Sequence, residues 1–149
     1  MKCKIYLSDE GYGHIIRQKA ITDSFLSSRS GEILFDVQTE NNFEVAKKIF
    51  KGFKCIQKYN NISWLKLEDG SPNLTAIKKH YIDYLNVSSD FIKKEQQSIE
   101  PYDFLITDFV YEAFEIGSLN SIPTFGVAHF TWDWFFSKLY PPSVQTKVL

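Results

Sequence analysis

Short apolar runs alternate with longer amphipathic segments along most of this chain of 149 residues. Each run has the length and composition of a buried strand, and each following segment carries apolar residues at helical spacing on one face. Such alternation predicts crossover βαβ units, in which the strands pair in parallel and helices cover both faces of the sheet. The pattern therefore favours an α/β fold.

The expected elements follow one another in a regular order. Strands are expected at Cys3–Leu7, Ile33–Val37, Lys54–Gln57, Phe104–Thr107 and Thr124–Ala128. Helices are expected at about His14–Ser28, Asn42–Lys51, Pro72–Ile99 and Tyr111–Leu119, with Ser71 as the cap of the third. The charged residues of the long third helix are expected to face solvent, and residues 59–70 to form a surface loop that folds back onto the body. We predict a single three-layer Rossmann-like domain over residues 1–149, with a parallel sheet of about five to six strands and helices on both faces.

Charge and cysteine content limit the class of partner and the compartment. The net charge of −1 gives no basic surface for nucleic acid, so no nucleic-acid partner is expected. Cys3 and Cys55 fall in expected strands, and two isolated cysteines form no disulfide framework. No charged-then-apolar leader opens the chain, and no apolar run approaches the roughly 20 residues needed to span a bilayer. These features together predict a cytoplasmic location.

A glycine-rich turn joins the first expected strand to the first expected helix. Gly11 and Gly13 let the backbone turn sharply and approach another molecule closely. His14 follows at the mouth of the helix. Because ligands of open α/β sheets bind beyond the carboxyl ends of the strands, an imidazole there is a candidate functional group. The alternative is a tight turn whose histidine only caps or packs.

This turn does not match the known nucleotide-binding fingerprints. The dinucleotide pattern needs a third glycine where Ile16 stands, and no Walker lysine follows. Asp9 and Glu10 place negative charge beside the helix start, which opposes the binding of a phosphate there. The turn is better suited to present His14 to a neutral, hydroxyl-rich ligand.

Two later stretches place further candidate functional side chains at the same edge of the predicted sheet. Asp108 follows an apolar strand and should face the same crevice as His14 if the two strands are neighbours. Residues 128–136 (AHFTWDWFF) begin where the last strand stops and contain His129, Trp132 and Asp133. The aromatic side chains of this stretch are too many to be buried together. We expect some to cover the end of the sheet and others to line a pocket or meet another domain.

Three short motifs resemble one known family. Residues 11–17 (GYGHIIR), 107–109 (TDF) and 130–134 (FTWDW) are similar to the N-terminal half of GT-B glycosyltransferases. The closest likeness is to the glycosyltransferase-like domain of plant arabinokinase and to bacterial relatives of the peptidoglycan N-acetylglucosaminyltransferase, and it extends from Lys4 to about Tyr140. Such enzymes have two Rossmann-like domains, one for the acceptor and one for the nucleotide-sugar donor. The resemblance implies that this chain is the acceptor-side half and that the C-terminal donor domain lies outside it.

The resemblance also implies roles for individual residues. In related plant glucosyltransferases, the histidine matching His14 is the general base and the aspartate matching Asp108 orients it. The plant motif has proline where Arg17 stands, so Arg17 is a candidate to meet a diphosphate or an acidic partner, or to pair with Asp23 or Glu10 on the surface. The expected acceptor-binding residues are Gly11, Gly13, Arg17, His129, Trp132 and Asp133.

The remaining expectations concern metals, cofactors and partners. The chain contains neither a D-x-D pair nor an H-E-x-x-H motif, so no metal site is expected, and no cofactor is expected beyond a nucleotide sugar held by the missing domain. The expected partners are a sugar or lipid-linked acceptor and a donor-binding domain or subunit, and peripheral membrane contact is a further candidate. Two alternatives stay open: a sugar-binding or regulatory module without catalysis, and a flavodoxin-like phosphate binder, against which Asp9 and Glu10 argue.

Overall fold

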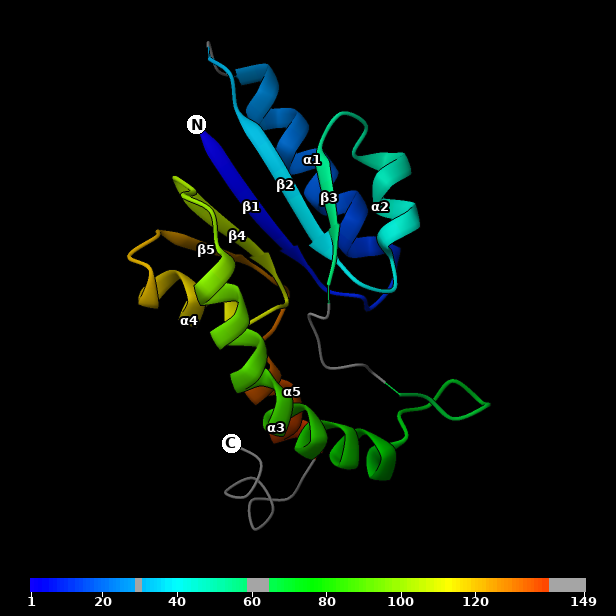
Figure 1. Ribbon diagram of the computed structural model, residues 1–149. Helices are drawn as coiled ribbons and strands as arrows, with labels where there is room; N and C mark the ends of the chain where they lie inside the picture. Colours follow the sequence, from blue (N-terminus) through cyan, green and yellow to red (C-terminus); the bar gives the residue numbers. More distant parts are fainter. Residues whose placement is uncertain (29–30, 59–64, 140–149) are drawn as a thin grey trace.

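A computed structural model describes residues 1–28, 31–58 and 65–139 of the chain, and these form an α/β fold around one parallel sheet (Figure 1). The strands are β1 (Lys2–Leu7), β2 (Leu34–Thr39), β3 (Lys54–Gln57), β4 (Phe104–Asp108) and β5 (Thr124–Val127). The helices are α1 (Tyr12–Ser28), α2 (Phe43–Ile49), α3 (Leu74–Ser98), α4 (Glu112–Leu119) and α5 (Trp132–Leu139). The strand order is β3-β2-β1-β4-β5, and every neighbouring pair is parallel. The fold class predicted from the sequence is confirmed.

The two faces of the sheet are covered by different helices (Figure 1). From β1 to β3 the chain adds strands on one side of β1, and its crossover helices α1 and α2 cover one face of the sheet. From β3 the chain returns to add β4 and β5 on the other side of β1, and α3 and α4 cover the opposite face. Right-handed crossovers require this change of face. The α1 and α2 face holds a core that includes Cys3, Ile5, Leu7, Val37, Ile15 and Ala46. The opposite face holds a second core that includes Tyr6, Phe91, Leu105, Ala113 and Ile116. The central strands β2, β1 and β4 are therefore buried on both sides, whereas the edge strands β3 and β5 are partly exposed.

Burial on both sides explains one departure from the sequence prediction. The ammonium nitrogen of Lys4 lies on the α3 face, 2.5 Å from a carboxylate oxygen of Glu95, and only 4% of Lys4 is exposed. The same oxygen accepts a hydrogen bond of 3.0 Å from the Tyr6 hydroxyl, and Lys58 contacts the other oxygen at 2.6 Å. Burial alone would raise the pKa of Glu95, but the two lysines lower it below its ordinary value. The expectation that all charged residues of α3 face solvent is therefore wrong at Glu95.

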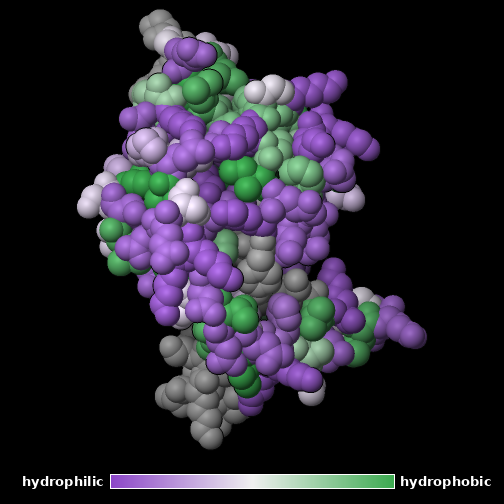
Figure 2. Space-filling view, in the orientation of Figure 1, coloured by the Kyte–Doolittle hydropathy of each residue, from purple (hydrophilic) through white to green (hydrophobic). Residues whose placement is uncertain are grey.

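The outer surface of α3 agrees better with the prediction. Figure 2 shows the molecule from the side on which α3 lies, and this side is mainly hydrophilic with small, separate hydrophobic patches. Exposed apolar residues on α3 are Leu74, Ile82, Leu85 and Val87. Scattered exposed apolar residues of this kind are normal in proteins. None of the described helices combines the length and apolar character that crossing a bilayer requires.

The segment before α3 differs from the predicted one. The side chain of Asn73, rather than that of Ser71, caps the helix, because it accepts a hydrogen bond of 3.0 Å from the backbone N–H of Ala76. Ser71 instead closes a turn in which its carbonyl accepts a hydrogen bond of 2.8 Å from Leu67 N–H. Figure 1 shows this turn extending away from the sheet, and Leu67 is exposed, so in its described part, residues 65–70, the loop does not fold back onto the body. Residues 59–64 lie outside the described part of the chain.

Gly117 allows α4 to pack closely against the connection to β5. A Cβ atom at Gly117 would lie 2.8 Å from the backbone oxygen of Ile122 and would collide with the Thr124 hydroxyl. We expect Gly117→Ala to lower the free energy of unfolding by about 2 kcal/mol, measured by urea denaturation, because overpacking forces the backbone to shift. The control is Gly13→Ala on α1, where nothing lies within 4 Å of the added atom, and which should stabilise the fold by about 0.5 kcal/mol. Equal stability of Gly117→Ala and the wild type would contradict this packing.

Candidate functional site

The candidate site lies where the strand order of the sheet reverses. The chain runs outward from β1 through β2 to β3, and then returns so that β4 pairs with the other side of β1. Leu7 and Asp108 are register partners at the carboxyl ends of β1 and β4. The N–H of Ser8 donates a hydrogen bond of 3.0 Å to the carbonyl oxygen of Asp108, which holds the two strand ends together. Such a switch point is where open α/β sheets bind ligands.

His14 and Asp108 meet at this switch point, as the sequence predicted for neighbouring strands. The Nδ1 atom of His14 lies 2.6 Å from Oδ1 of Asp108. The side chain of His14 is 16% exposed, whereas that of Asp108 is completely buried. The carboxylate is therefore inside the fold, and the imidazole lies between it and the surface.

The glycine turn determines how His14 reaches β4. Gly11 has a φ of +92°, in the left-handed region that favours glycine, and it lets the chain leave β1 and enter α1 within a few residues. Gly13 has ordinary helical geometry within α1 and is exposed. Gly11 therefore has a conformational role, whereas Gly13 leaves open space in front of the turn.

The carboxylate of Asp108 contacts two further side chains of α1. Arg17 Nε donates to Oδ2 at 3.0 Å, and the terminal Nη2 of the same guanidinium donates to Oδ1. Gln18 Nε2 also donates to Oδ2, at 2.9 Å. Burial alone would raise the pKa of Asp108, but the hydrogen bonds from His14, Arg17 and Gln18 outweigh it and hold that pKa below its ordinary value. Asp108 is therefore an ionised carboxylate surrounded by donors.

These contacts correct one prediction and add one residue. Arg17 pairs with Asp108, whereas Asp23 pairs with Lys19 at 2.5 Å on the outer side of α1. Gln18 was not among the residues predicted for this site from the sequence. Its position four residues after His14, on the same side of the helix, is a signal that could have found it.

The distance between His14 and Asp108 indicates where the imidazole carries its proton. Two acceptors 2.6 Å apart would repel one another, so Nδ1 donates its proton to Oδ1 of Asp108. In the neutral ring, Nε2 then holds a lone pair and can accept a proton or a hydrogen bond. This is the arrangement that a general base needs.

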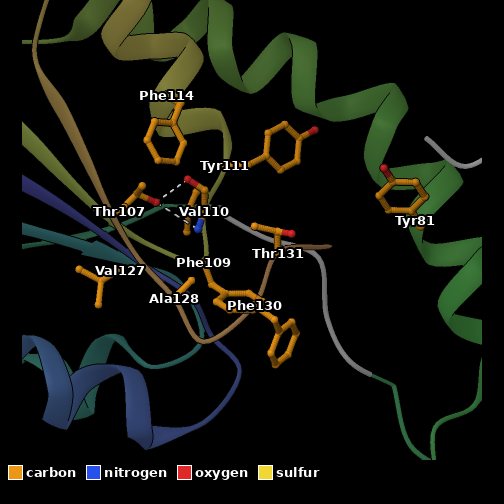
Figure 3. Close-up of a pocket in the computed structure, with 11 residues that line it drawn as sticks. Tyr81, Thr107, Phe109, Val110, Tyr111, Phe114, Val127, Ala128, Phe130 and Thr131 are labelled. Atoms are coloured by element: carbon orange, nitrogen blue, oxygen red, sulfur yellow. Dashed lines mark hydrogen bonds between the residues drawn. The ribbon is translucent and has the colours of Figure 1, made fainter. Parts of the chain in front are cut away.

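An apolar cavity of about 350 Å³ lies next to Phe109, the residue that follows Asp108 (Figure 3). Its main lining residues are Tyr81, Phe109, Tyr111, Phe114, Phe130 and Thr131, which come from α3, from α4 and the loop before it, and from the segment after β5. Phe109 joins the cavity to the polar site, because its ring packs edge-on against both His14, at 5.7 Å between centroids, and Phe130, at 4.9 Å. The ring of Phe109 therefore separates the imidazole of His14 from the cavity, and His14 is not one of the lining residues.

The loop that carries Phe109 is held in an unusual conformation. Phe109 has a φ of +70°, which is rare for residues other than glycine. The Thr107 hydroxyl donates to the carbonyl oxygen of Val110 and accepts a hydrogen bond of 3.1 Å from Val110 N–H (Figure 3). These two bonds fix the loop on either side of Phe109. Strained residues of this kind are common at ligand sites, where the surrounding structure maintains them.

The structure does not bring the other predicted residues to this site in the same way. His129 is exposed in a bend after β5, and the described lining of the cavity includes its neighbours Ala128 and Phe130 instead. Trp132 and Asp133 begin α5, but their side chains lie outside the described part of the structure. Among the residues that the structure describes, no group of three or more His, Cys, Asp or Glu side chains could hold a metal ion.

Asp9 has a different role from the one expected. Its Oδ1 atom accepts a hydrogen bond of 2.5 Å from the Thr39 hydroxyl and further bonds of 3.1–3.3 Å from the backbone N–H groups of residues 40–42. The carboxylate is therefore satisfied just before α2, which weakens the sequence argument that Asp9 repels anions from the start of α1.

Comparison with known proteins identifies a similar fold. No known family profile and no curated protein matches the sequence. Among solved structures, the chain is similar to Phytolacca americana UGT2 complexed with UDP-2-fluoro-glucose and pterostilbene, with a TM-score of 0.54 and 15% identity over 93% of this chain and 34% of that one. It is also similar to TcCGT1 in complex with UDP, with a TM-score of 0.50 and 14% identity over 90% of this chain and 29% of that one. The chain thus has a glycosyltransferase-like fold and spans about a third of the length of these structures.

Proposed function

We propose that this chain is the acceptor-binding part of a glycosyltransferase that transfers a hexosyl group from a nucleotide sugar to a hydroxyl group. The observation that carries the proposal is the contact of His14 with the buried carboxylate of Asp108 beside an apolar cavity at the switch point of the sheet. The glycosyltransferase-like fold supports it. Transfer requires a donor-binding domain or subunit, because the described site contains no group suited to a nucleotide diphosphate.

The proposed chemistry follows from the arrangement of the pair. The hydroxyl oxygen of the acceptor attacks the anomeric carbon, the bond from that carbon to the diphosphate breaks, and the hydroxyl proton passes to Nε2 of His14. The diphosphate leaves with the bonding electrons. Asp108 holds the proton on Nδ1 and stabilises the imidazolium that forms.

The lining of the cavity favours one class of acceptor. Aromatic rings form most of its wall, and its volume of about 350 Å³ falls within the range of small-molecule sites. An acceptor with an apolar body and one reactive hydroxyl, such as a phenol or a lipid alcohol, fits this wall better than a free sugar does. A lipid alcohol would bring the site to a membrane surface.

A binding experiment on the chain itself tests this proposal. Calorimetric titration with pterostilbene, glucose and UDP should detect binding of pterostilbene alone, because the cavity is apolar and the nucleotide site belongs to another domain. Phe130→Ala should weaken that binding about tenfold or more, since it removes apolar contact in the cavity. The matched control is Phe125→Ala, because Phe125 is 60% exposed and lines a separate groove.

Binding of a ligand other than pterostilbene would indicate a different function for the chain. Binding of UDP would contradict the assignment to the acceptor side and would favour a phosphate binder. Binding of glucose without pterostilbene would favour the second candidate function, a sugar-binding or regulatory module. The bidentate contact of Arg17 with Asp108 is the observation that favours this second candidate. The guanidinium occupies the carboxylate that would otherwise serve His14 alone in its role as a base.

A further inference from the structure

Arg17 occupies the carboxylate that orients His14. It lies on α1, one turn beyond the histidine, and its guanidinium contacts both carboxylate oxygens of Asp108. Its Nη2 atom also lies 3.2 Å from Nδ1 of His14. With the bond from Gln18, four nitrogen contacts surround one buried carboxylate.

The charges of this cluster decide what the imidazole can do. In a histidine–aspartate pair without a third group, the carboxylate compensates the positive charge of a protonated imidazole. Here the guanidinium of Arg17 already compensates Asp108, which is completely buried. A second positive charge on His14 would lie next to the guanidinium, in surroundings with little water to screen it. The cluster is therefore neutral when His14 is neutral.

We propose that Arg17 is a positioning residue that keeps the His14 imidazole neutral, with its proton on Nδ1, by sharing the carboxylate of Asp108. The proposal deepens the proposed function and rests on it for its consequence: Nε2 stays available to a neutral hydroxyl group and takes up a full positive charge only during transfer. Among the described residues, the charged groups in contact with the ring are Asp108 from β4 and Arg17 from α1, and the uncharged ring of Phe109 packs against it.

The proton on His14 can be observed without any transfer reaction. The chain has three histidines, so the imidazole nitrogen signals in a two-bond ¹H–¹⁵N NMR spectrum can be assigned by comparison with His14→Ala. In the wild type we expect the neutral His14 ring to show the tautomer with hydrogen on Nδ1. Hydrogen on Nε2 in the neutral wild-type ring would overturn the proposal, whatever the variants show.

Two substitutions of Arg17 then measure its effect. In Arg17→Gln at pH 7, the spectrum should show a larger fraction of doubly protonated His14 ring than in the wild type, because the full charge of Asp108 then acts on the imidazole alone. Arg17→Lys keeps a positive charge in place and should show the same fraction as the wild type. An unchanged fraction in a folded Arg17→Gln protein would show that Arg17 has only a structural role, and would overturn the proposal.

The chain offers a matched control for the loss of charge. Lys19→Gln removes one positive charge from the same helix, but Lys19 pairs with Asp23 on the outer side of α1. It should leave the imidazole signals of His14 nearly unchanged, and the signals of His80 should be alike in every variant. Because these measurements need neither donor nor acceptor, their failure is distinguishable from failure of the proposed transferase function.

Discussion

Replacing His14 with alanine is expected to lower the rate of glycosyl transfer by a factor of about 10²–10⁴, measured as kcat with the complete enzyme that contains this chain and its donor-binding domain. The imidazole is the one group of the described site placed to take the hydroxyl proton, because its Nδ1 atom is fixed by Asp108 and its Nε2 atom is left as an acceptor. The affinity for the nucleotide sugar should stay nearly unchanged, since the donor is expected to bind another domain. A fall in kcat without loss of donor affinity would support the role of a base.

Two companion variants separate this role from simpler ones. Asp108→Asn should lower the rate comparably, because an amide no longer fixes the proton on Nδ1. His129→Ala should stay close to the wild-type rate, because His129 is exposed beyond the end of β5. Transfer at the wild-type rate by His14→Ala would remove the base assignment and favour the module without catalysis. Loss of activity in His129→Ala alone would move the role to that residue.

The contact between His14 and Asp108 could be predicted because it depends on strand order and little else. Each residue follows or ends a strand, and carboxyl ends of neighbouring parallel strands meet at one edge of the sheet. Periodicity located the ends of the strands to within one or two residues. The expected bounds of β3 (Lys54–Gln57) agree with the structure at both ends, whereas β2 (Leu34–Thr39) begins one residue later and ends two residues later than expected. A prediction of this kind needs only the order of elements and the direction of crossovers.

The partners of Arg17 and Lys4 could not be predicted in the same way. Periodicity tells which residues share a face of an element, but not which distant residue covers that face. Lys4 meets Glu95 because the 25 residues of α3 extend across β1, and Arg17 meets Asp108 across 91 residues of sequence. Alternation in β1 marked Lys4 as facing away from the apolar core. It did not show that the buried carboxylate of Glu95 lies on the opposite face of the sheet.

Glu112 is a buried acidic group whose ionisation should affect the stability of the fold. It lies in the first turn of α4 and is completely buried. The Tyr84 hydroxyl of α3 donates to its Oε1 atom, whereas Oε2 has no hydrogen-bond partner among the described residues. Burial raises the pKa of Glu112 from an ordinary value of 4.5 to about 8, so the folded protein holds this carboxyl in its neutral form near pH 7.

The sign of the pH dependence follows from this difference. The folded state binds the proton more tightly than the unfolded state does, so the contribution to stability is full below pH 4.5, falls as the pH rises, and is lost above about pH 8. At 1.36 kcal/mol for each unit of pKa, the upper limit of the loss is about 4–5 kcal/mol. This loss runs opposite to that of Asp108, whose lowered pKa makes the fold less stable in acid.

Glu112→Gln should remove this dependence, because an amide resembles the neutral carboxyl and does not titrate. Urea denaturation at pH 5, 7 and 9 should show the wild type losing stability toward pH 9 by several kcal/mol more than the variant does. Glu115→Gln, one turn away on the exposed side of α4, should lose nearly as much stability as the wild type, since Glu115 faces water and its charge is the smallest of the causes that set the pKa of Glu112. If the wild type and Glu112→Gln lose stability in parallel between pH 5 and 9, the carboxyl is ionised in the folded protein at neutral pH, and the packing of α4 against Tyr84 must then stabilise a buried negative charge.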